Sequence, residues 1–248
     1  LGMTIDANTG VFSWTPTEAQ GGTAPSVTIT VTDSGTGTLA DSETFTISVG
    51  EVNDAPTITS NGGGASAGVT IAENTTAVAT VTATDADGPS LTYSIAGGAD
   101  AARFTIDAST GALGFVTAPN FEAATDSSAD NVYDVVVQAS DGALTATQSL
   151  AVGVSNVNEA PTALAPGSAA VNIQALGGTS VATLVATDPD TGDAISFSLV
   201  DDGGGRFAVD AASGQLSVAS GARLDDQGGT PFVLVVRVTD AAGLTYEQ

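Results

Sequence analysis

Apolar and polar residues alternate along many short stretches of this chain, as they do in β-strands with one buried face. Gly, Asp and Asn lie between these stretches, which is typical of turns. In the middle of the chain the predicted strands are 69–72, 77–84, 91–95, 104–106, 112–116, 132–139 and 144–154. Seven short strands at this spacing predict an all-β fold, a Greek-key β-sandwich.

The same pattern continues on both sides of this central stretch. Strands are predicted at 27–31, 44–49, 181–187, 195–199, 207–209, 215–218 and 232–239. The linker Val-Asn-Asp-Ala-Pro at 52–56 returns as Val-Asn-Glu-Ala-Pro at 157–161. A domain-sized interval between matching segments indicates tandem repeats.

We therefore predict an elongated array of seven-stranded sandwiches. Residues 1–54 would be the C-terminal part of one repeat, and 55–159 would be a complete repeat. Residues 160–248 would be a further repeat that lacks its last strand.

Three aspartates occupy matching places in this pattern. Asp6, Asp107 and Asp210 are each followed by Ala and, four positions on, by Gly. An Asp at such a position can hydrogen-bond the backbone of its own turn. We therefore predict hairpin turns here, and a structural rather than a ligand-binding role for the three carboxylates.

Charge is the most unusual feature of the composition. Twenty-eight Asp and Glu residues face four basic residues, for a formal net charge of −24. Such a surface repels nucleic acid and anionic membranes, and no apolar run is long enough to span a bilayer, so we expect neither nucleic acid as a partner nor membrane insertion of this segment. Two explanations of the charge stay open: a solvated surface that aids solubility or suits high salt, and a set of divalent-ion sites.

Cys, His and Lys are all absent from the chain. Their absence removes disulfides, thiolate and imidazole metal ligands, the usual general base and the Schiff-base amine. Any bound metal must therefore be a hard cation held by oxygen, which means calcium before magnesium.

In the complete repeat, acidic and amide side chains gather at strand ends. Because alternate strands of a sandwich run in opposite directions, these ends fall into two groups at opposite poles. The pole beside the outgoing linker would hold Glu73, Asn120 and Glu122. The pole beside the incoming linker would hold Asp85, Asp87 and Asp141. Two neighbouring repeats would then place carboxylates on both sides of each linker.

These segments resemble the motifs of cadherin repeats, in the bacterial cadherin-like form found in large secreted or surface adhesins. Ile-Ala-Glu-Asn at 71–74 resembles the family's Pro-Glu-Asn motif, and Asp-Ala-Asp at 85–87 resembles its Asp-x-Asp motif. Asn-Phe-Glu at 120–122 resembles Asp-x-Glu, and 51–56 resembles the linker motif, shortened by one residue. Segment 2–16 is more similar to the Ig-like cadherin variant typified by dystroglycan. The resemblance covers essentially the whole chain.

The resemblance implies Ca²⁺ as the cofactor at two joints between repeats. For the first joint it implies the ligands Glu51, Asn53, Asp54, Asp85, Asp87 and Asp141, with Glu18 as an additional candidate. For the second joint it implies Glu73, Asn120, Glu122, Asn156, Asn158, Glu159, Asp188, Asp190 and Asp240.

Some positions depart from the family pattern. Asn120, Asn156 and Glu159 stand where the family has aspartates, which predicts fewer or more weakly bound ions at the second joint. The third repeat has Gln174-Ala175 where Glu-Asn is expected, although Leu-Asp-Asp-Gln at 224–227 resembles the acidic motif before the sixth strand.

The resemblance implies an extracellular or cell-surface location and a non-enzymatic role. The chain would be a calcium-stiffened extender or stalk segment of a bacterial secreted or cell-surface adhesin. The alternative is a carbohydrate-binding or homophilic cell-adhesion module, whose partner would be a polysaccharide or like repeats. Aromatic residues are only 5% of the chain, which argues against a sugar-stacking platform. A carboxylate pair could in principle hydrolyse a glycoside, but the joints already account for the acidic residues.

Overall fold

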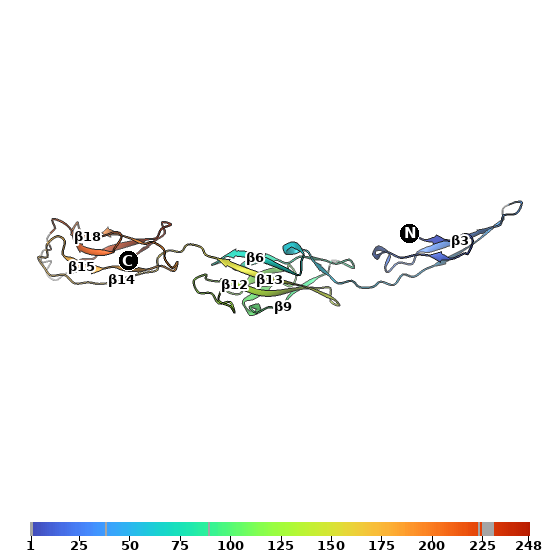
Figure 1. Cartoon of the computed structure of the whole chain (residues 1–248), viewed down its shortest axis with the longest axis horizontal. Helices are drawn as coiled ribbons and strands as arrows, with labels where there is room; N and C mark the ends of the chain where they lie inside the picture. Colours follow the sequence, from blue (N-terminus) through green and yellow to red (C-terminus); the bar gives the residue numbers. More distant parts are fainter. Residues whose placement is uncertain (1, 38, 89, 223, 225–230) are drawn as a thin grey trace.

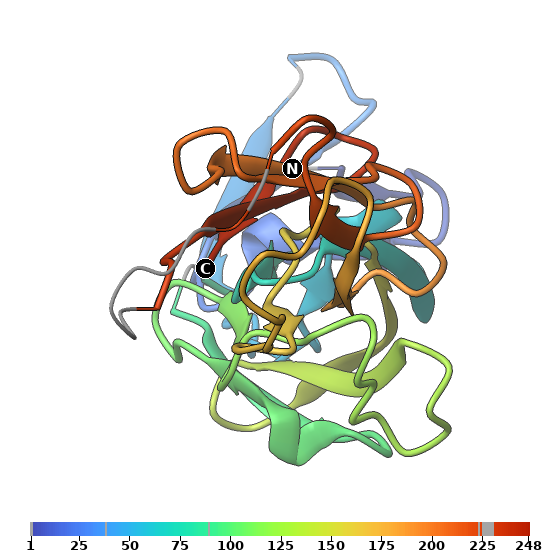
Figure 2. The ribbon, with the colours of Figure 1, turned by 90° about the vertical axis from the view of Figure 1, so that its left-hand side faces the viewer.

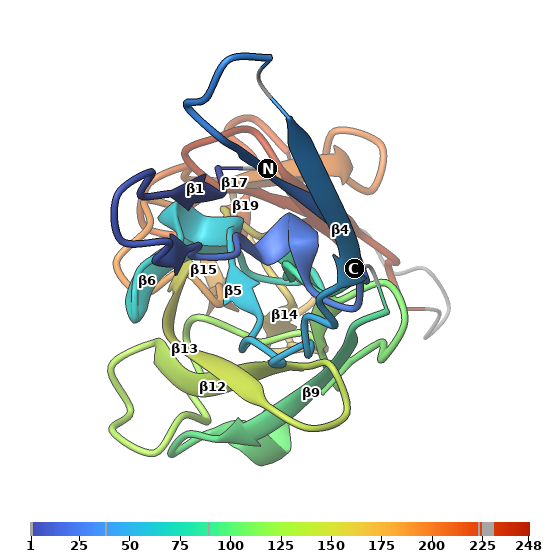
Figure 3. The same cartoon turned by 90° about the vertical axis from the view of Figure 1, so that its right-hand side faces the viewer.

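The computed structural model describes residues 2–37, 39–88, 90–222, 224 and 231–248. Its strands form three groups that follow one another along a single long axis, with an extended linker between successive groups (Figure 1). Views along that axis from either end show the groups largely superimposed (Figures 2 and 3). The all-β, elongated fold predicted from the sequence is therefore confirmed.

The first group holds two antiparallel hairpins and a short 3-10 helix. Its elements are β1 (Thr4–Ile5), β2 (Phe12–Ser13), η1 (Glu18–Gln20), β3 (Ser26–Thr32) and β4 (Ala40–Thr46). β1 pairs with β2, and β3 pairs with β4 along its whole length. The predicted strand 44–49 therefore lies earlier in the chain than expected. Ile47 and Val49 still donate backbone hydrogen bonds to Pro25 and Thr23.

The second group is a complete sandwich. Its elements are β5 (Thr57–Ile58), η2 (Ser60–Gly62), β6 (Ser66–Ala72), β7 (Ala77–Thr80), β8 (Ala83–Thr84), β9 (Thr92–Gly97), η3 (Ala101–Arg103), β10 (Phe104–Ile106), β11 (Ala112–Phe115), β12 (Val132–Ser140) and β13 (Thr145–Ser155). One sheet has the order β6-β13-β12-β9 and the other β10-β11-β7, with β5 paired to β8. Strand β12 explains the core: Tyr133, Val135, Val137 and Ala139 point inward and are at most 1% exposed, while the residues between them face outward or lie at the edge.

The third group repeats this plan with shorter strands. Its elements are β14 (Ala163–Ala165), β15 (Ser180–Thr183), β16 (Val185–Thr187), β17 (Ser196–Asp201), β18 (Phe207–Val209), β19 (Gln215–Val218), β20 (Val235–Thr239) and β21 (Thr245–Glu247). Its own core is centred on Phe197, Phe207, Val218 and Val238. The sequence predicted that the last strand is missing here. The structure instead has the three-residue β21 paired with β20.

Two predicted strands are each divided by a crossing between sheets. The prediction 77–84 is observed as β7 and β8, and 181–187 as β15 and β16, with the two halves in different sheets. At the first crossing Val81 is fully buried and its N–H donates to the carbonyl of Gly111. Gly111 has φ +71°, and a side chain there would collide with the Val81 carbonyl. The alternating pattern continues through the crossing, so it cannot reveal the division.

The three predicted Asp turns are confirmed. Oδ1 of Asp6 accepts the N–H groups of the residues two and three positions on, at 2.9 and 2.7 Å. Asp107 does the same at 3.0 and 2.7 Å, and Asp210 at 3.2 and 2.8 Å. These donors stabilise the ionised carboxylate, and the pKa of each aspartate lies below its ordinary value mainly because of the backbone hydrogen bond from the third residue.

Replacing Asp107 with Ala should lower the stability of the second group at neutral pH, because the turn between β10 and β11 loses two hydrogen-bond acceptors. Since the folded pKa of Asp107 is depressed, its contribution is present above pH 3.8 and is lost as the pH falls through the folded pKa. Chemical denaturation at pH 7 and in acid should show a gap between wild type and variant that closes in acid. The exposed strand variant Asp134→Ala is the matched control. A gap of equal size at both pH values would contradict this account.

Candidate metal centres at two linkers

The first linker is bound to the second group by hydrogen bonds that start from its own backbone and side chains. The N–H of Asp54 donates to Oδ2 of Asp87 at 2.6 Å, and Nδ2 of Asn53 donates to Oδ2 of Asp141 at 2.7 Å. The N–H of Asp87 donates in turn to Oδ1 of Asp85 at 2.9 Å. Loops after β8 and β12 thus present three carboxylates to the linker.

The second linker repeats these bonds residue for residue. The N–H of Glu159 donates to Oδ2 of Asp190 at 2.7 Å, and Nδ2 of Asn158 donates to Oδ2 of Asp240 at 2.7 Å. The N–H of Asp190 donates to Oδ1 of Asp188 at 3.0 Å. The two joints are therefore built on one plan, as the repeated linker segments predict.

Each joint also brings together three carboxylates from different segments. At the first joint, oxygens of Glu18, Glu51 and Asp87 all lie within 4.8 Å of one another. At the second joint, the same holds for Glu73, Glu122 and Glu159. We call these sets the first and the second carboxylate triad. Each triad takes members from the linker and from at least one adjoining group, so it spans the joint.

Glu73 fastens the second linker to the group below it. The side chain is 1% exposed, and its two oxygens accept the N–H groups of Val157 and Phe121, each at 2.8 Å. Nδ2 of Asn74, the next residue, donates to Oε1 of Glu159 at 2.8 Å. Residues at the end of β6 therefore contact both the linker and the loop before β12.

The first joint has no such bond from the group below. Glu18 reaches the linker from η1, where the Thr17 N–H donates to Oε1 of Gln20 at 2.9 Å and closes the turn. Its neighbour there is Glu51, a like charge, whose carboxylate also lies directly over Gly21, where a side chain would collide with it. This contact is stable only if a proton or a cation lies between the carboxylates.

Crowding of carboxylates raises several pKa values. A hydrogen bond with Glu51, followed by burial and the charges of Glu51, Asp54 and Asp87, raises the pKa of Glu18 to about 7. Burial, together with the charges of Glu73, Glu159 and Asp190, raises the pKa of Glu122. Burial and the charges of three neighbouring aspartates likewise raise the pKa of Asp188.

Asp141 and Asp240 have the opposite behaviour. Hydrogen bonds from Asn53 and Asn158, respectively, are the largest cause that lowers their pKa values. Each joint thus contains firmly ionised carboxylates beside others that resist ionisation.

The donor set suits a hard cation. Asp85, Glu122, Asp188 and Asp193 each bury one carboxylate oxygen that has no hydrogen-bond partner in the described structure. The one ion pair among the described residues joins Arg237 to Glu247, so no Arg balances the linker carboxylates there. Calcium takes six to eight oxygen ligands, including carboxylates and carbonyls. Buried, unpaired carboxylate oxygens around an Asn-rich linker are ligands of that kind.

Two of the residues predicted as ligands are not drawn into the triads. Oδ1 of Asn120 accepts the N–H of Ala123 at 2.7 Å and so closes its own turn. Asn156 is exposed. Both positions carry Asn where the related motif has Asp, and their side chains behave as turn and surface residues.

Two further residues at the second joint were missed by the sequence analysis. Asp193 lies in the loop after β16, where its charge contributes to the raised pKa of Asp188. Asn74 contacts Glu159 as described above. The only sequence signal for Asp193 is an additional acid shortly after the Asp-x-Asp pair.

The third group has no acidic counterpart of Glu73. The sequence analysis aligned Gln174-Ala175 with Glu73-Asn74, but this alignment is wrong by one residue. Gln174 shares the left-handed backbone of Asn74, with φ values of 63° and 61°, and each donates its N–H to the loop before the sixth strand. Ile173 therefore stands at the place of Glu73. Residues 225–227 of the predicted acidic motif lie outside the described residues.

Comparison with known proteins places this fold. Residues 1–50 match the family model described as a putative Ig domain. Protocadherin Gamma B2 extracellular cadherin domains 3-6 are similar to the chain at 24% identity and a TM-score of 0.57, covering 99% of this chain and 64% of that one. The Protocadherin GammaB4 extracellular domain is similar at 25% identity and a TM-score of 0.54, covering 99% and 43%. Mouse Cadherin-23 EC22-24 is similar at 22% identity and a TM-score of 0.53, covering 99% and 80%.

The chain thus spans less than two thirds of the first two structures. It consists of cadherin-like and Ig-like β-sandwich repeats, which confirms the resemblance inferred from the motifs. None of the described helices is long and apolar enough to cross a membrane.

In the metal-free chain, the Glu18 carboxyl should titrate near pH 7, and Glu51→Gln should move its midpoint toward the ordinary value of 4.5, since the charge and the hydrogen bond that raise the pKa come first from Glu51. Because the folded pKa is raised, the Glu18–Glu51 contact is favourable below pH 4.5 and is lost as the pH rises through about 7. Carboxyl carbon NMR shifts in the presence of a chelator measure both midpoints. An unchanged Glu18 midpoint in the variant would show that the two carboxylates are not neighbours in solution.

Proposed function

We propose that this chain is a calcium-stiffened extender segment of a bacterial secreted or cell-surface adhesin. Its cadherin-like and Ig-like extracellular fold supports an adhesion or extender module. The observation that carries the proposal is the pair of carboxylate triads, each spanning a linker and each without a basic counter-charge among the described residues. The lack of cysteine accords with an extracellular protein that relies on ions rather than disulfides for rigidity.

The ions would be held at both joints by carboxylate oxygens. At the first joint, we assign Glu18, Glu51, Asp54, Asp85, Asp87 and Asp141 as ligands, with Asn53 in the linker. At the second joint, we assign Glu73, Glu122, Glu159, Asp188, Asp190, Asp193 and Asp240, with Asn158 in the linker. Asn120 and Asn156 would need a side-chain rearrangement to take part. The repeats would be the units 1–54, 55–159 and 160–248.

The proposed mechanism is mechanical. Calcium supplies positive charge and oxygen coordination where carboxylates of two repeats meet. With the charge balanced, the linker hydrogen bonds to Asp87 and Asp190 hold each following repeat in place. Without it, the triads repel and the repeats move apart about the linkers. One site contributes about 2.7 kcal/mol when free calcium is a hundredfold above its dissociation constant.

The two joints should differ in how much they depend on the ion. Glu73 gives the second linker two backbone hydrogen bonds that need no metal. The first linker instead meets the group below through Glu18 and Glu51, which repel one another when ionised. We therefore propose that calcium removal frees the first joint more than the second.

The exposed aromatic residues favour a spacer over a sugar-binding module. The chain has one Trp, three Tyr and eight Phe. Of these, Phe45 alone is classed as exposed in the described structure. A flat sugar-stacking platform needs several such rings on one face. The acidic residues are accounted for by the joints, so we propose no enzymatic role for them.

Calcium titration by calorimetry tests this proposal. Wild type should bind calcium at micromolar to millimolar concentrations. The double variant Glu122→Gln, Glu159→Gln should weaken binding at the second joint by at least about tenfold, since even outer-shell changes at metal sites cost 10–100-fold. The double variant Glu18→Gln, Glu51→Gln should do the same at the first joint.

The matched control is Glu43→Gln, which removes one charge from the exposed strand β4 away from both joints. Its titration should coincide with that of wild type. Wild-type binding that is absent up to several millimolar calcium, or reduced equally by the control and by the joint variants, would overturn the proposal and leave the acidity as plain surface charge.

A further inference from the structure

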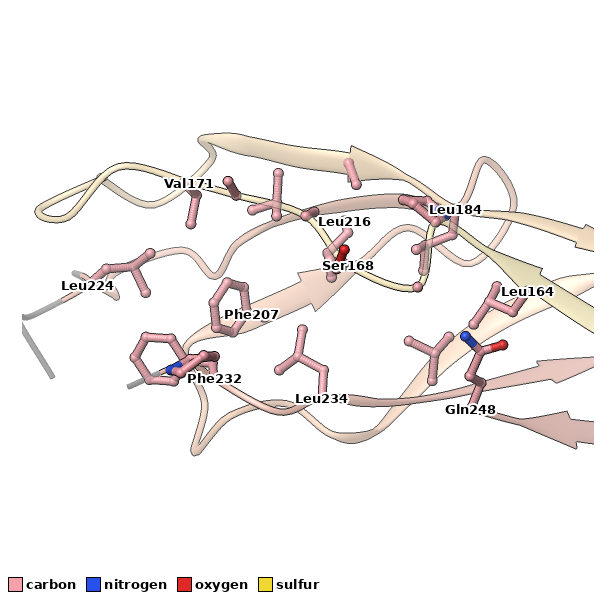
Figure 4. Close-up of a pocket in the computed structure, with 18 of the residues that line it drawn as sticks. Leu164, Ser168, Val171, Leu184, Phe207, Leu216, Leu224, Phe232, Leu234 and Gln248 are labelled. Atoms are coloured by element: carbon pink, nitrogen blue, oxygen red, sulfur yellow. The ribbon is translucent and has the colours of Figure 1, made fainter. Parts of the chain in front are cut away.

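An apolar groove of about 420 Å³ opens in the third group. Phe207 and Leu216 line it from β18 and β19, and Phe232 and Leu234 line it from the segment that precedes β20. Figure 4 shows these side chains around a common space, with Gln248 at one end and Phe232 at the other. The groove therefore extends from the end of β21 along the interior of the sandwich.

The corresponding space in the second group is filled by half of a strand. There β13 is eleven residues long, and its second half, residues 149–155, lies between two neighbours. It pairs in parallel with all seven residues of β6 and antiparallel with the first part of β12. Its inward side chains, Leu150, Val152 and Val154, are at most 6% exposed and form part of the core.

Strand register shows where this half strand would begin in the third group. Gln148 lies opposite Val137 in the β12–β13 ladder. Gln248 lies opposite Val236, with backbone hydrogen bonds of 2.9 and 3.0 Å in both directions. Because Val236 occupies in β20 the place of Val137 in β12, Gln248 is the counterpart of Gln148. The counterparts of residues 149–155 would therefore follow Gln248 directly.

Two irregularities of the third group have the same explanation. The predicted strand 232–239 is observed only from Val235, and Val233 is 75% exposed. Residues 166–172, which correspond to β6 when Gln174 is aligned with Asn74, form no strand. In the second group, both corresponding segments pair with residues 149–155. One absent partner thus leaves two backbone edges unpaired and the groove open between them.

We propose that this groove is a strand-docking site whose occupant is an extended, uncharged segment joined directly to Gln248. The segment has the seven-residue length of β6 and carries apolar side chains at its second, fourth and sixth positions. It continues β21, pairs with 166–172 on one side and with 232–234 on the other, and places its three apolar side chains in the groove. Ser-Leu-Ala-Val-Gly-Val-Ser, the sequence of residues 149–155, is a suitable probe.

The test compares three chains by amide hydrogen exchange, all with chelator present so that the outcome is independent of calcium. The first is the chain ending at Gln248, and the second has the probe heptapeptide appended after Gln248. The third carries the same appended heptapeptide with Asp at the positions that correspond to Leu150, Val152 and Val154. The probe should slow exchange at residues 232–234 and 168–172 by at least about tenfold, because these amides gain strand partners. The Asp-bearing segment should leave them unprotected.

Two results would overturn the proposal. Equal exchange in the first and second chains, or equal protection by the apolar and the Asp-bearing segments, would show that the groove does not select such a strand. Protection of these amides in the chain ending at Gln248, together with a dimer in sedimentation, would show that a second copy occupies the groove.

Discussion

The repulsion among carboxylates at the linkers is the constraint on which the arrangement of this chain depends. Three carboxylates lie within 4.8 Å of one another at each joint. Two unit charges about 4 Å apart interact by about 1 kcal/mol in water and by about 4 kcal/mol near a protein surface of lower effective dielectric. With no Arg paired to these groups in the described structure, the joints are stable only when protons or cations reduce the charge. The raised pKa values of Glu18, Glu122 and Asp188 express the same repulsion.

Each sandwich contributes to this constraint without depending on it. The cores centred on Tyr133 and on Val238 are separate, and each is closed by its own strands. Strand ends then present acidic loops to the linkers. A chain built in this way keeps its repeats folded whatever the state of the joints, and the joints alone decide how the repeats are oriented. The difference between Glu73, which fastens one linker by neutral backbone donors, and Glu18, which meets the other by a like charge, gives the two joints unequal sensitivity to ions.

Much of this organisation is predictable from the sequence, because it rests on local patterns. Alternation locates most strands, the Asp-Ala-x-x-Gly segments locate the turns, and the repeated linkers locate the joints. Alternation does not detect the crossings at Val81 and Leu184, because these depend on contacts with the distant Gly111 and Gly214. The position of Gln174 is likewise fixed by a left-handed backbone rather than by residue type. Asp193 and Asn120 show that a carboxylate or amide joins a cluster only when its loop points it there.

Small-angle scattering of the intact chain, in calcium and then in chelator, tests the central claim most directly. If balanced charge holds the repeats in line, the calcium form should have the larger maximum dimension and the scattering of a rod, and the chelated form should be shorter on average or clearly more flexible. Both forms should keep the same far-UV circular dichroism, since the sandwich cores do not include the joints. Identical scattering curves in the two conditions would contradict the account.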